Sequence, residues 1–88
     1  MTKIRKATYV EAWQIRLEFS TGEAGTIDLA ELVARDGAMV APLKDPEYFR
    51  KFFLELGALA WPNGFDLSPS ALYRDLHARG LLEKIRAA

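Results

Sequence analysis

The chain has 88 residues, half of them apolar, with twelve Lys and Arg against twelve Asp and Glu, no cysteine and one histidine. A chain of this length forms one domain, which buries about 60–65% of the surface that its unfolded form exposes. Without cysteine the chain has no disulfide, thiolate zinc site or thiol nucleophile, and its zero net charge argues against binding nucleic acid over a wide surface.

The chain contains no apolar run long enough to cross a bilayer, and no apolar stretch follows its basic N-terminus. We therefore expect a cytoplasmic protein with no membrane partner. We also expect no cofactor and no metal, because the glycines form no phosphate-binding cluster and no metal-ligand spacing is present. The expected organisation is a single α+β domain over residues 1–80, followed by a C-terminal tail over residues 81–88 that is either frayed or helical.

The N-terminal third predicts a three-stranded antiparallel meander. Its clearest strand covers residues 13–19, where apolar and polar residues alternate without a break. Residues 3–10 are rich in β-branched side chains and predict the preceding strand, with a bulge near Ala7 to restore its alternation. A turn at Thr21-Gly22 then leads into a third strand over residues 25–29.

A short helix is predicted directly after this meander. Asp28 and Glu31 have the spacing of a capping box, in which both carboxylates accept hydrogen bonds from unpaired backbone N–H groups. The helix should pass through residues 29–33 and end at Asp36-Gly37, where glycine can adopt the left-handed conformation.

The middle of the chain predicts a second helix and two short strands. Asp45-Pro46 combines an N-cap carboxylate with proline at the first helical position, so a helix should run from Pro46 to about Lys51. Residues 52–61 then favour β structure, divided into two strands by Gly57.

The C-terminal part predicts a turn and a last helix. Residues 62–64 read Pro-Asn-Gly, which is typical of a tight turn. Ser68-Pro69 starts a helix that Gly80 ends, with Leu81 packed against Leu76. The fold class is therefore α+β: a small, mainly antiparallel sheet of four to five strands with two or three short helices, the C-terminal helix packed on the sheet.

The order of several segments resembles a bacterial family known as domain of unknown function 2442. The resemblance spans about Ile4 to Leu76, and residues 61–67 are its most specific part. It is carried by Phe19-Ser20-Thr21-Gly22, Ile27-Asp28-Leu29, Pro42-Leu43-Lys44-Asp45-Pro46, Phe49, Trp61-Pro62-Asn63-Gly64-Phe65-Asp66-Leu67 and Leu72-Tyr73.

This resemblance implies a small α+β domain without an assigned reaction. Similar proteins lie beside another small protein of unknown function (family 4160) or are fused ahead of a helix-turn-helix domain. We expect no such fusion here, because too few residues follow Leu76. The resemblance therefore implies that the partner is another small protein, and it suggests that the two could form a toxin–antitoxin-like pair.

The residues give little support for an enzyme. His77 is the single imidazole and falls on the last predicted helix, where a lone histidine is typical of packing or surface positions. Asp28 and Asp45 fall where helix caps are expected, and Asp66 precedes a helix start. We therefore expect no catalytic, cofactor-binding or metal-binding residues.

Residues 61–66 combine two aromatic side chains, a tight turn and an acid. The favoured interpretation is structural: Trp61 and Phe65 pack across the sheet while Asn63 and Gly64 turn the chain. One alternative is a recognition tip that binds a partner protein, and another is a small enzyme or ligand binder with its site here. The partner-binding residues would be Trp61, Asn63, Phe65, Asp66 and Tyr73.

Two other surfaces are candidates for contacts. No predicted helix or strand buries Met39, Val40 and Leu43, so this connection could form a homodimer contact or cap the open end of the sheet. The strand over residues 3–10 could accept a partner's strand at an exposed edge.

Nucleic-acid binding through basic termini is a less favoured alternative. The termini would form a modest basic face if they met in space, but no aromatic residues are interleaved with the charges. The basic residues are Lys3, Arg5, Lys6, Arg74, Arg79, Lys84 and Arg86.

Overall fold

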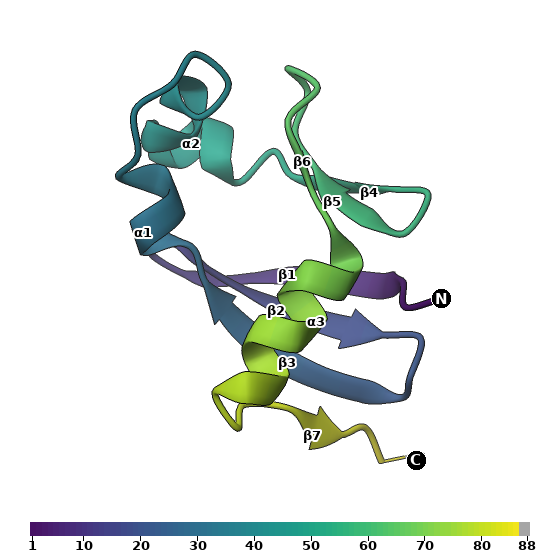
Figure 1. The fold of residues 1–88 in the computed structure, drawn as a ribbon. Helices are drawn as coiled ribbons and strands as arrows, with labels where there is room; N and C mark the ends of the chain where they lie inside the picture. Colours follow the sequence, from purple (N-terminus) through teal and green to yellow (C-terminus); the bar gives the residue numbers. More distant parts are fainter. Residues whose placement is uncertain (87–88) are drawn as a thin grey trace.

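A computed structural model describes residues 1–86 of the chain, which has the expected α+β architecture (Figure 1). Its strands form two antiparallel sheets, where we had expected one. The first sheet has the order β1-β2-β3-β7, with β1 (Ile4–Glu11), β2 (Gln14–Phe19), β3 (Glu23–Asp28) and β7 (Glu83–Lys84). The second has the order β4-β5-β6, with β4 (Phe53–Glu55), β5 (Ala58–Ala60) and β6 (Asp66–Leu67). The helices are α1 (Ala30–Val33), α2 (Pro46–Phe49), α3 (Pro69–Ala78) and a 3₁₀ turn, η1 (Ala41–Lys44).

The elements are arranged along one long direction of a molecule that measures 38 × 24 × 22 Å. Helix α3 crosses one face of the four-stranded sheet, and the second sheet lies beyond the β1 edge, together with α2 (Figure 1). The backbone N–H of Ile4 donates to the carbonyl of Gly57 at 2.9 Å, which joins the two sheets.

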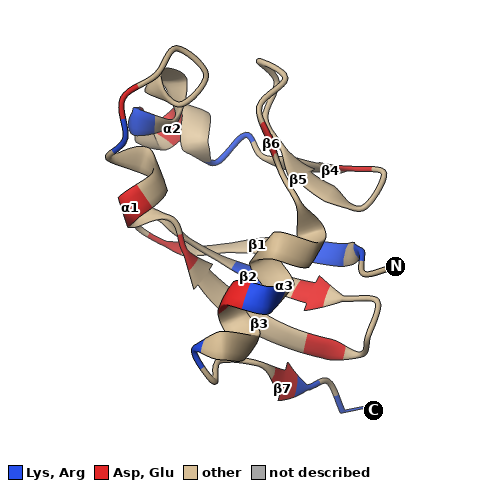
Figure 2. Ribbon diagram, viewed as in Figure 1, with Lys and Arg blue, Asp and Glu red and all other residues tan. Residues whose placement is uncertain are grey.

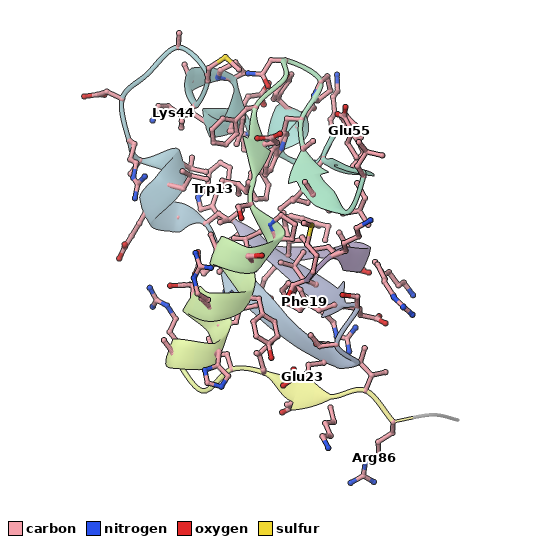
Figure 3. All side chains as sticks on the ribbon, turned by 45° about the vertical axis from the view of Figure 1, so that its right-hand side comes forward. Trp13, Phe19, Glu23, Lys44, Glu55 and Arg86 are labelled. Carbon is pink, nitrogen blue, oxygen red and sulfur yellow. The ribbon has the colours of Figure 1, made fainter. Side chains whose placement is uncertain are left out.

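The core lies where α3, η1 and α2 meet the two sheets. The alternation predicted for residues 13–19 is confirmed, because Ile15, Leu17 and Phe19 are buried on one face of β2. Trp13 precedes β2 and packs edge-on against Phe49, with ring centroids 5.0 Å apart. Trp13 and Phe19 both point into the interior (Figure 3).

The bulge predicted near Ala7 is found slightly earlier in β1, and a second one lies near its end. Ala7 pairs regularly with Leu17, and the register shifts instead between Ile4 and Lys6 and between Tyr9 and Glu11. Each shift inserts one extra residue into β1, so the strand keeps its alternation between the two irregular positions and loses it at both ends.

Helix α1 is shorter than its sequence predicted. The Asp28 side chain accepts a hydrogen bond from the Ala30 N–H at 2.9 Å, so α1 begins one residue late and the capping box with Glu31 does not form. The helix also ends at Val33, before Asp36-Gly37. Its end is stabilised differently, because the Lys44 ammonium donates to the carbonyls of Val33 and Arg35.

The start of α2 is confirmed, and the helix ends two residues before the predicted end at about Lys51. Asp45 accepts a hydrogen bond from the Glu47 N–H at 3.1 Å, as expected for an N-cap before Pro46. The helix ends at Phe49, and the chain then turns into the second sheet. The two strands predicted on either side of Gly57 are confirmed as β4 and β5, whereas β6 was not predicted.

Both ends of α3 follow the prediction. Ser68 Oγ accepts from the Ala71 N–H, and Gly80 has a φ of +69°. The N–H groups of Leu81 and Gly80 donate to the carbonyls of Leu76 and His77, which is the hydrogen-bond pattern of a Schellman motif. Leu81 itself stays half exposed.

The segment after Gly80 is not helical where we had allowed a helix. Glu83 pairs with Ala24 and Lys84 with Glu23, which adds β7 to the edge of the first sheet. The last two residues of the expected tail lie outside the described residues.

Candidate functional site

Trp61 is part of the core. Its side chain is 1% exposed, and its indole N–H donates to the carbonyl of Phe49 at 2.8 Å. The rings of Phe49 and Phe65 both pack against it in a tilted arrangement, with centroids 5.9 Å away. The favoured structural interpretation therefore holds for Trp61, which has no surface to offer a partner.

Asn63 fastens the turn between β5 and β6 to a neighbouring loop. Its side-chain N–H donates to the carbonyl of Met39 at 3.0 Å, and its side-chain oxygen accepts from the Phe65 N–H at 3.2 Å. Both ends of the amide are thus engaged inside the molecule. Asn63 positions two loops, and this role explains its presence without a partner.

The five residues predicted as one partner-binding group do not come together. Phe65 is half-buried against Trp61, and Asp66 is exposed on β6. Tyr73 lies on α3 and contacts β3 of the other sheet. The predicted grouping of Tyr73 with residues 61–66 is therefore wrong, because α3 carries Tyr73 away from the second sheet.

The proposed self-association patch is also mostly buried. Leu43 is fully buried and Val40 is 8% exposed, because η1 turns both into the core. Met39 is 46% exposed and remains at the surface beside the turn that Asn63 holds. The expectation that this connection lacks a covering element is wrong for Val40 and Leu43.

Tyr73 and Glu23 form a side-chain hydrogen bond between α3 and the first sheet. The Tyr73 hydroxyl donates to the Glu23 carboxylate at 2.5 Å (Glu23 is labelled in Figure 3). This bond lowers the pKa of the Glu23 carboxyl below its usual value and raises the pKa of the Tyr73 hydroxyl. The Tyr73 ring also packs edge-on against Phe19 and stacks on His77. The contact acts as a clamp between α3 and β3.

The turn between β4 and β5 presents a large apolar side chain to solvent. Leu56 is 92% exposed and Phe53 on β4 is 42% exposed. Leu56 and Gly57 have φ values of +51° and +82°, so both central residues of this two-residue turn are left-handed. Such turns favour Asn-Gly or Asp-Gly, because leucine in this conformation places its Cβ close to the backbone.

Gly57 is required at its position for two reasons. Besides its positive φ, a Cβ there would lie 2.8 Å from the Cβ of Lys3. The carbonyl of Gly57 also accepts the hydrogen bond from Ile4. The hairpin is therefore fixed to β1, and Leu56 projects from a rigid support. Leu56 was not predicted from the sequence, although a leucine before the glycine of a short hairpin was the signal that could have identified it.

The basic termini do not converge into one face. β1 and β7 lie at opposite edges of the four-stranded sheet, with β2 and β3 between them. Glu18 and Glu23 lie on these intervening strands, so acidic residues separate the two basic ends (Figure 2). Arg16 forms an ion pair with Glu18 at 2.7 Å in the same region.

Residues 1–86 lack two features that would suggest a metal ligand or a membrane span. No group of three or more His, Asp or Glu side chains there could hold a metal ion. No helix in this part of the chain has the length and apolar character needed to span a bilayer.

Comparison with known proteins gives a match to a protein family. No curated protein and no solved structure matches the chain. One family model matches residues 4–78 and is described as "Protein of unknown function (DUF2442)". This match covers most of the chain and confirms the resemblance noted in its sequence: the protein belongs to the DUF2442 family.

Proposed function

We propose that the protein is a non-enzymatic module that binds a partner protein through the turn between β4 and β5. The observation that carries this proposal is Leu56, which is 92% exposed and held at a φ of +51°. The partner's apolar surface would cover Leu56 and the neighbouring Phe53.

Both the backbone conformation and the exposed side chain of Leu56 are energetically unfavourable in the isolated protein. The left-handed conformation of a residue other than glycine costs about 1–2 kcal/mol. The exposed leucine side chain also forgoes the roughly 1.5–3 kcal/mol that its burial would contribute. A partner that buries Leu56 recovers the second amount, and the rigid turn presents the side chain with little loss of conformational entropy on binding.

The polar groups of the chain support a non-enzymatic role, because many of them already stabilise the fold. Asp45 and Ser68 accept hydrogen bonds at helix starts, and Asp28 does so just before α1. The Glu23 carboxylate is bound by Tyr73. A cytoplasmic location and a partner in a toxin–antitoxin-like pair stay predictions, which the identity of the captured partner tests.

The experiment is affinity capture from the source cells with two matched variants. Leu56→Asn replaces the exposed leucine by a residue that tolerates a positive φ. Ala12→Asn makes the same kind of change in the β1–β2 turn, where Ala12 has a φ of +47°. We expect the wild-type and Ala12→Asn proteins to retain the same partner protein, and Leu56→Asn to lose it.

Two results would overturn the proposal. One is a partner that Leu56→Asn retains in the same amount as the wild type. The other is turnover of a small molecule by the purified protein. Loss of the partner cannot be ascribed to misfolding, because Leu56→Asn is expected to stabilise the turn.

A further inference from the structure

The edge of β3 opposite β2 is left partly open. Over the described residues, β7 pairs with β3 at Glu23 and Ala24, and the ladder stops there. β3 itself continues to Asp28 and pairs with β2 along this length. Its last residues therefore lie at an edge of the four-stranded sheet with no neighbouring strand among residues 1–86.

Two hydrogen bonds establish which backbone groups face this edge. Leu29 donates to the carbonyl of Trp13, on the β2 side, and Ile85 donates to the carbonyl of Gly22, on the β7 side. Hydrogen bonds alternate in direction along an antiparallel strand. The N–H and C=O groups of Thr26 and Asp28 therefore point to the open edge, in the same series as those of Gly22.

The path of the chain after α3 keeps β7 from extending further. The N–H of Leu81 already donates a hydrogen bond to the carbonyl of Leu76 at the end of α3, so it cannot pair with β3. The carbonyl of Leu81 approaches β3 so closely that a Cβ on Gly25 would lie 2.8 Å from it. Leu81 thus crosses over Gly25 and does not pair with Thr26.

Three hollows follow this open edge from one end to the other. Their volumes are about 270, 70 and 210 Å³ in order from β7 to α1. Thr26 lines the first and second, and Asp28 lines the second and third. The opposite wall is formed by the end of α3 and the segment after it, through Asp75, Leu76, Arg79, Leu81, Glu83 and Lys84.

The two ends of this groove differ in charge. Around the first hollow lie Lys84, Glu83 and Arg16, and Arg16 is already paired with Glu18 at 2.7 Å. Asp28 and Glu31 outnumber Arg79 around the third, and Arg79 is already paired with Asp75 at 3.1 Å. The groove is therefore acidic beside α1, whereas its β7 end is close to neutral and presents the Lys84 ammonium.

We propose that this groove binds an extended segment of a partner protein, which adds to the sheet as an antiparallel strand along Thr26 and Asp28. The segment would form backbone hydrogen bonds with these two residues, the usual way a strand is added to a sheet edge. Charge complementarity sets its direction: a basic residue near its N-terminal end lies over Asp28 and Glu31, and an acidic residue near its C-terminal end lies by Lys84.

The probe is an acetylated and amidated hexapeptide with the sequence Lys-Thr-Val-Thr-Val-Glu, titrated into the full-length ¹⁵N-labelled protein. We expect saturable changes in the NMR shifts of the Thr26 and Asp28 amides, with half-saturation on the order of 1 mM because the interface is small. The charge-exchanged peptide Glu-Thr-Val-Thr-Val-Lys should bind about threefold to tenfold more weakly, as two exposed ion pairs become repulsive.

Two variants of the protein make the test specific. Thr26→Pro removes an N–H that faces the open edge and should abolish peptide binding. Ala7→Pro is its control on the opposite edge strand, β1, and should leave binding unchanged. Glu31→Lys reverses one side-chain charge and leaves the backbone hydrogen-bonding groups of β3 unchanged. It should weaken binding of the Lys-Thr-Val-Thr-Val-Glu peptide about threefold and strengthen binding of the charge-exchanged peptide.

Three outcomes would overturn the proposal: no shift at Thr26 and Asp28, equal binding by Thr26→Pro and wild type, or equal affinity for the two peptides. Concentration-dependent shifts at these amides without peptide would also contradict it, since a second copy would then occupy the edge. Leu56→Asn should leave the titration unchanged, because the β4–β5 hairpin is attached to the other edge of the sheet.

Discussion

The two turns of the second sheet have opposite properties. The turn between β5 and β6 is held by both ends of the Asn63 amide and lies beside the buried Trp61. The turn between β4 and β5 presents Leu56 to solvent in a left-handed conformation. The more distinctive sequence thus belongs to the turn that stabilises the fold, and the less distinctive one to the turn that exposes Leu56 and that we propose as the binding element.

This difference follows from where the large side chains point. An aromatic residue near a turn provides binding energy to a partner when its area is still exposed, and Trp61 has already buried its area against Phe49 and Phe65. Leu56 has not. Exposure therefore favours the β4–β5 turn as the proposed binding element, whereas residue type alone draws attention to residues 61–66.

The largest expected effect is that of Trp61→Ala. Loss of the buried indole should lower the free energy of unfolding by about 3–5 kcal/mol, a large part of the roughly 4–13 kcal/mol available to a domain of this size. Urea unfolding measures this loss. Asp66→Ala, at an exposed position in the same segment, is the control and should change the stability little; a similar cost for both variants would contradict the core assignment of Trp61.

Asn63→Ala should have the next largest effect, about 1–2 kcal/mol, because it removes two hydrogen bonds. Asn63→Asp keeps an acceptor for the Phe65 N–H and loses the donor to Met39, so its cost should be intermediate. Hydrogen exchange at the Phe65 amide should accelerate in the alanine variant and less in the aspartate variant. Equal exchange rates in all three proteins would show that Asn63 does not fasten this turn.

Leu56→Asn should raise the free energy of unfolding by about 1 kcal/mol, since asparagine tolerates the left-handed conformation. Ala12→Asn should give a gain of the same sign in the other hairpin. Thermal and urea unfolding of both variants test the strain directly. A loss of stability on Leu56→Asn would mean that the leucine contributes to the fold, and the two turns would then no longer differ in kind.

The smallest effect concerns the clamp between Tyr73 and Glu23, which lies outside both turns. The pKa of the Glu23 carboxyl is lowered in the folded state, so its contribution to stability is present above the unfolded pKa and is lost as the pH falls through the folded one. The raised pKa of Tyr73 gives the opposite limit: its contribution is present below the unfolded pKa and is lost as the pH rises through the folded one.

Tyr73→Phe tests this clamp without changing the ring. Between pH 6 and pH 3 the wild type should lose more stability than the variant, because only the wild type loses the bond when Glu23 is protonated. Parallel stability curves for the two proteins over this interval would contradict the clamp.

The sequence predicted the fold class and the elements that depend on local patterns. The alternation of apolar and polar residues along β2 and the N-caps at Asp45 and Ser68 depend on neighbouring residues alone, and all three are found in the structure. The end of α1 was not predictable in this way, because Lys44, from η1, caps its last carbonyls. The same holds for β6 and β7, which are two-residue strands defined by their partners.

The candidate site was harder to predict than the fold. Burial of Val40 and Leu43 depends on how η1 packs, and no spacing in the sequence expresses it. Exposure of Leu56 depends on a two-residue turn whose type follows from the pairing of Glu55 with Ala58. Motif specificity pointed to residues 61–66, although a distinctive segment is equally compatible with a packing role.

Photocrosslinking from the two turns to the captured partner tests most directly which turn contacts the partner. A benzophenone side chain is placed at position 56 in one protein and at position 66 in the other, both exposed positions of the second sheet. We predict a covalent adduct with the partner from position 56 and none from position 66. An adduct from position 66 without one from position 56 would contradict the proposal that the β4–β5 turn binds the partner.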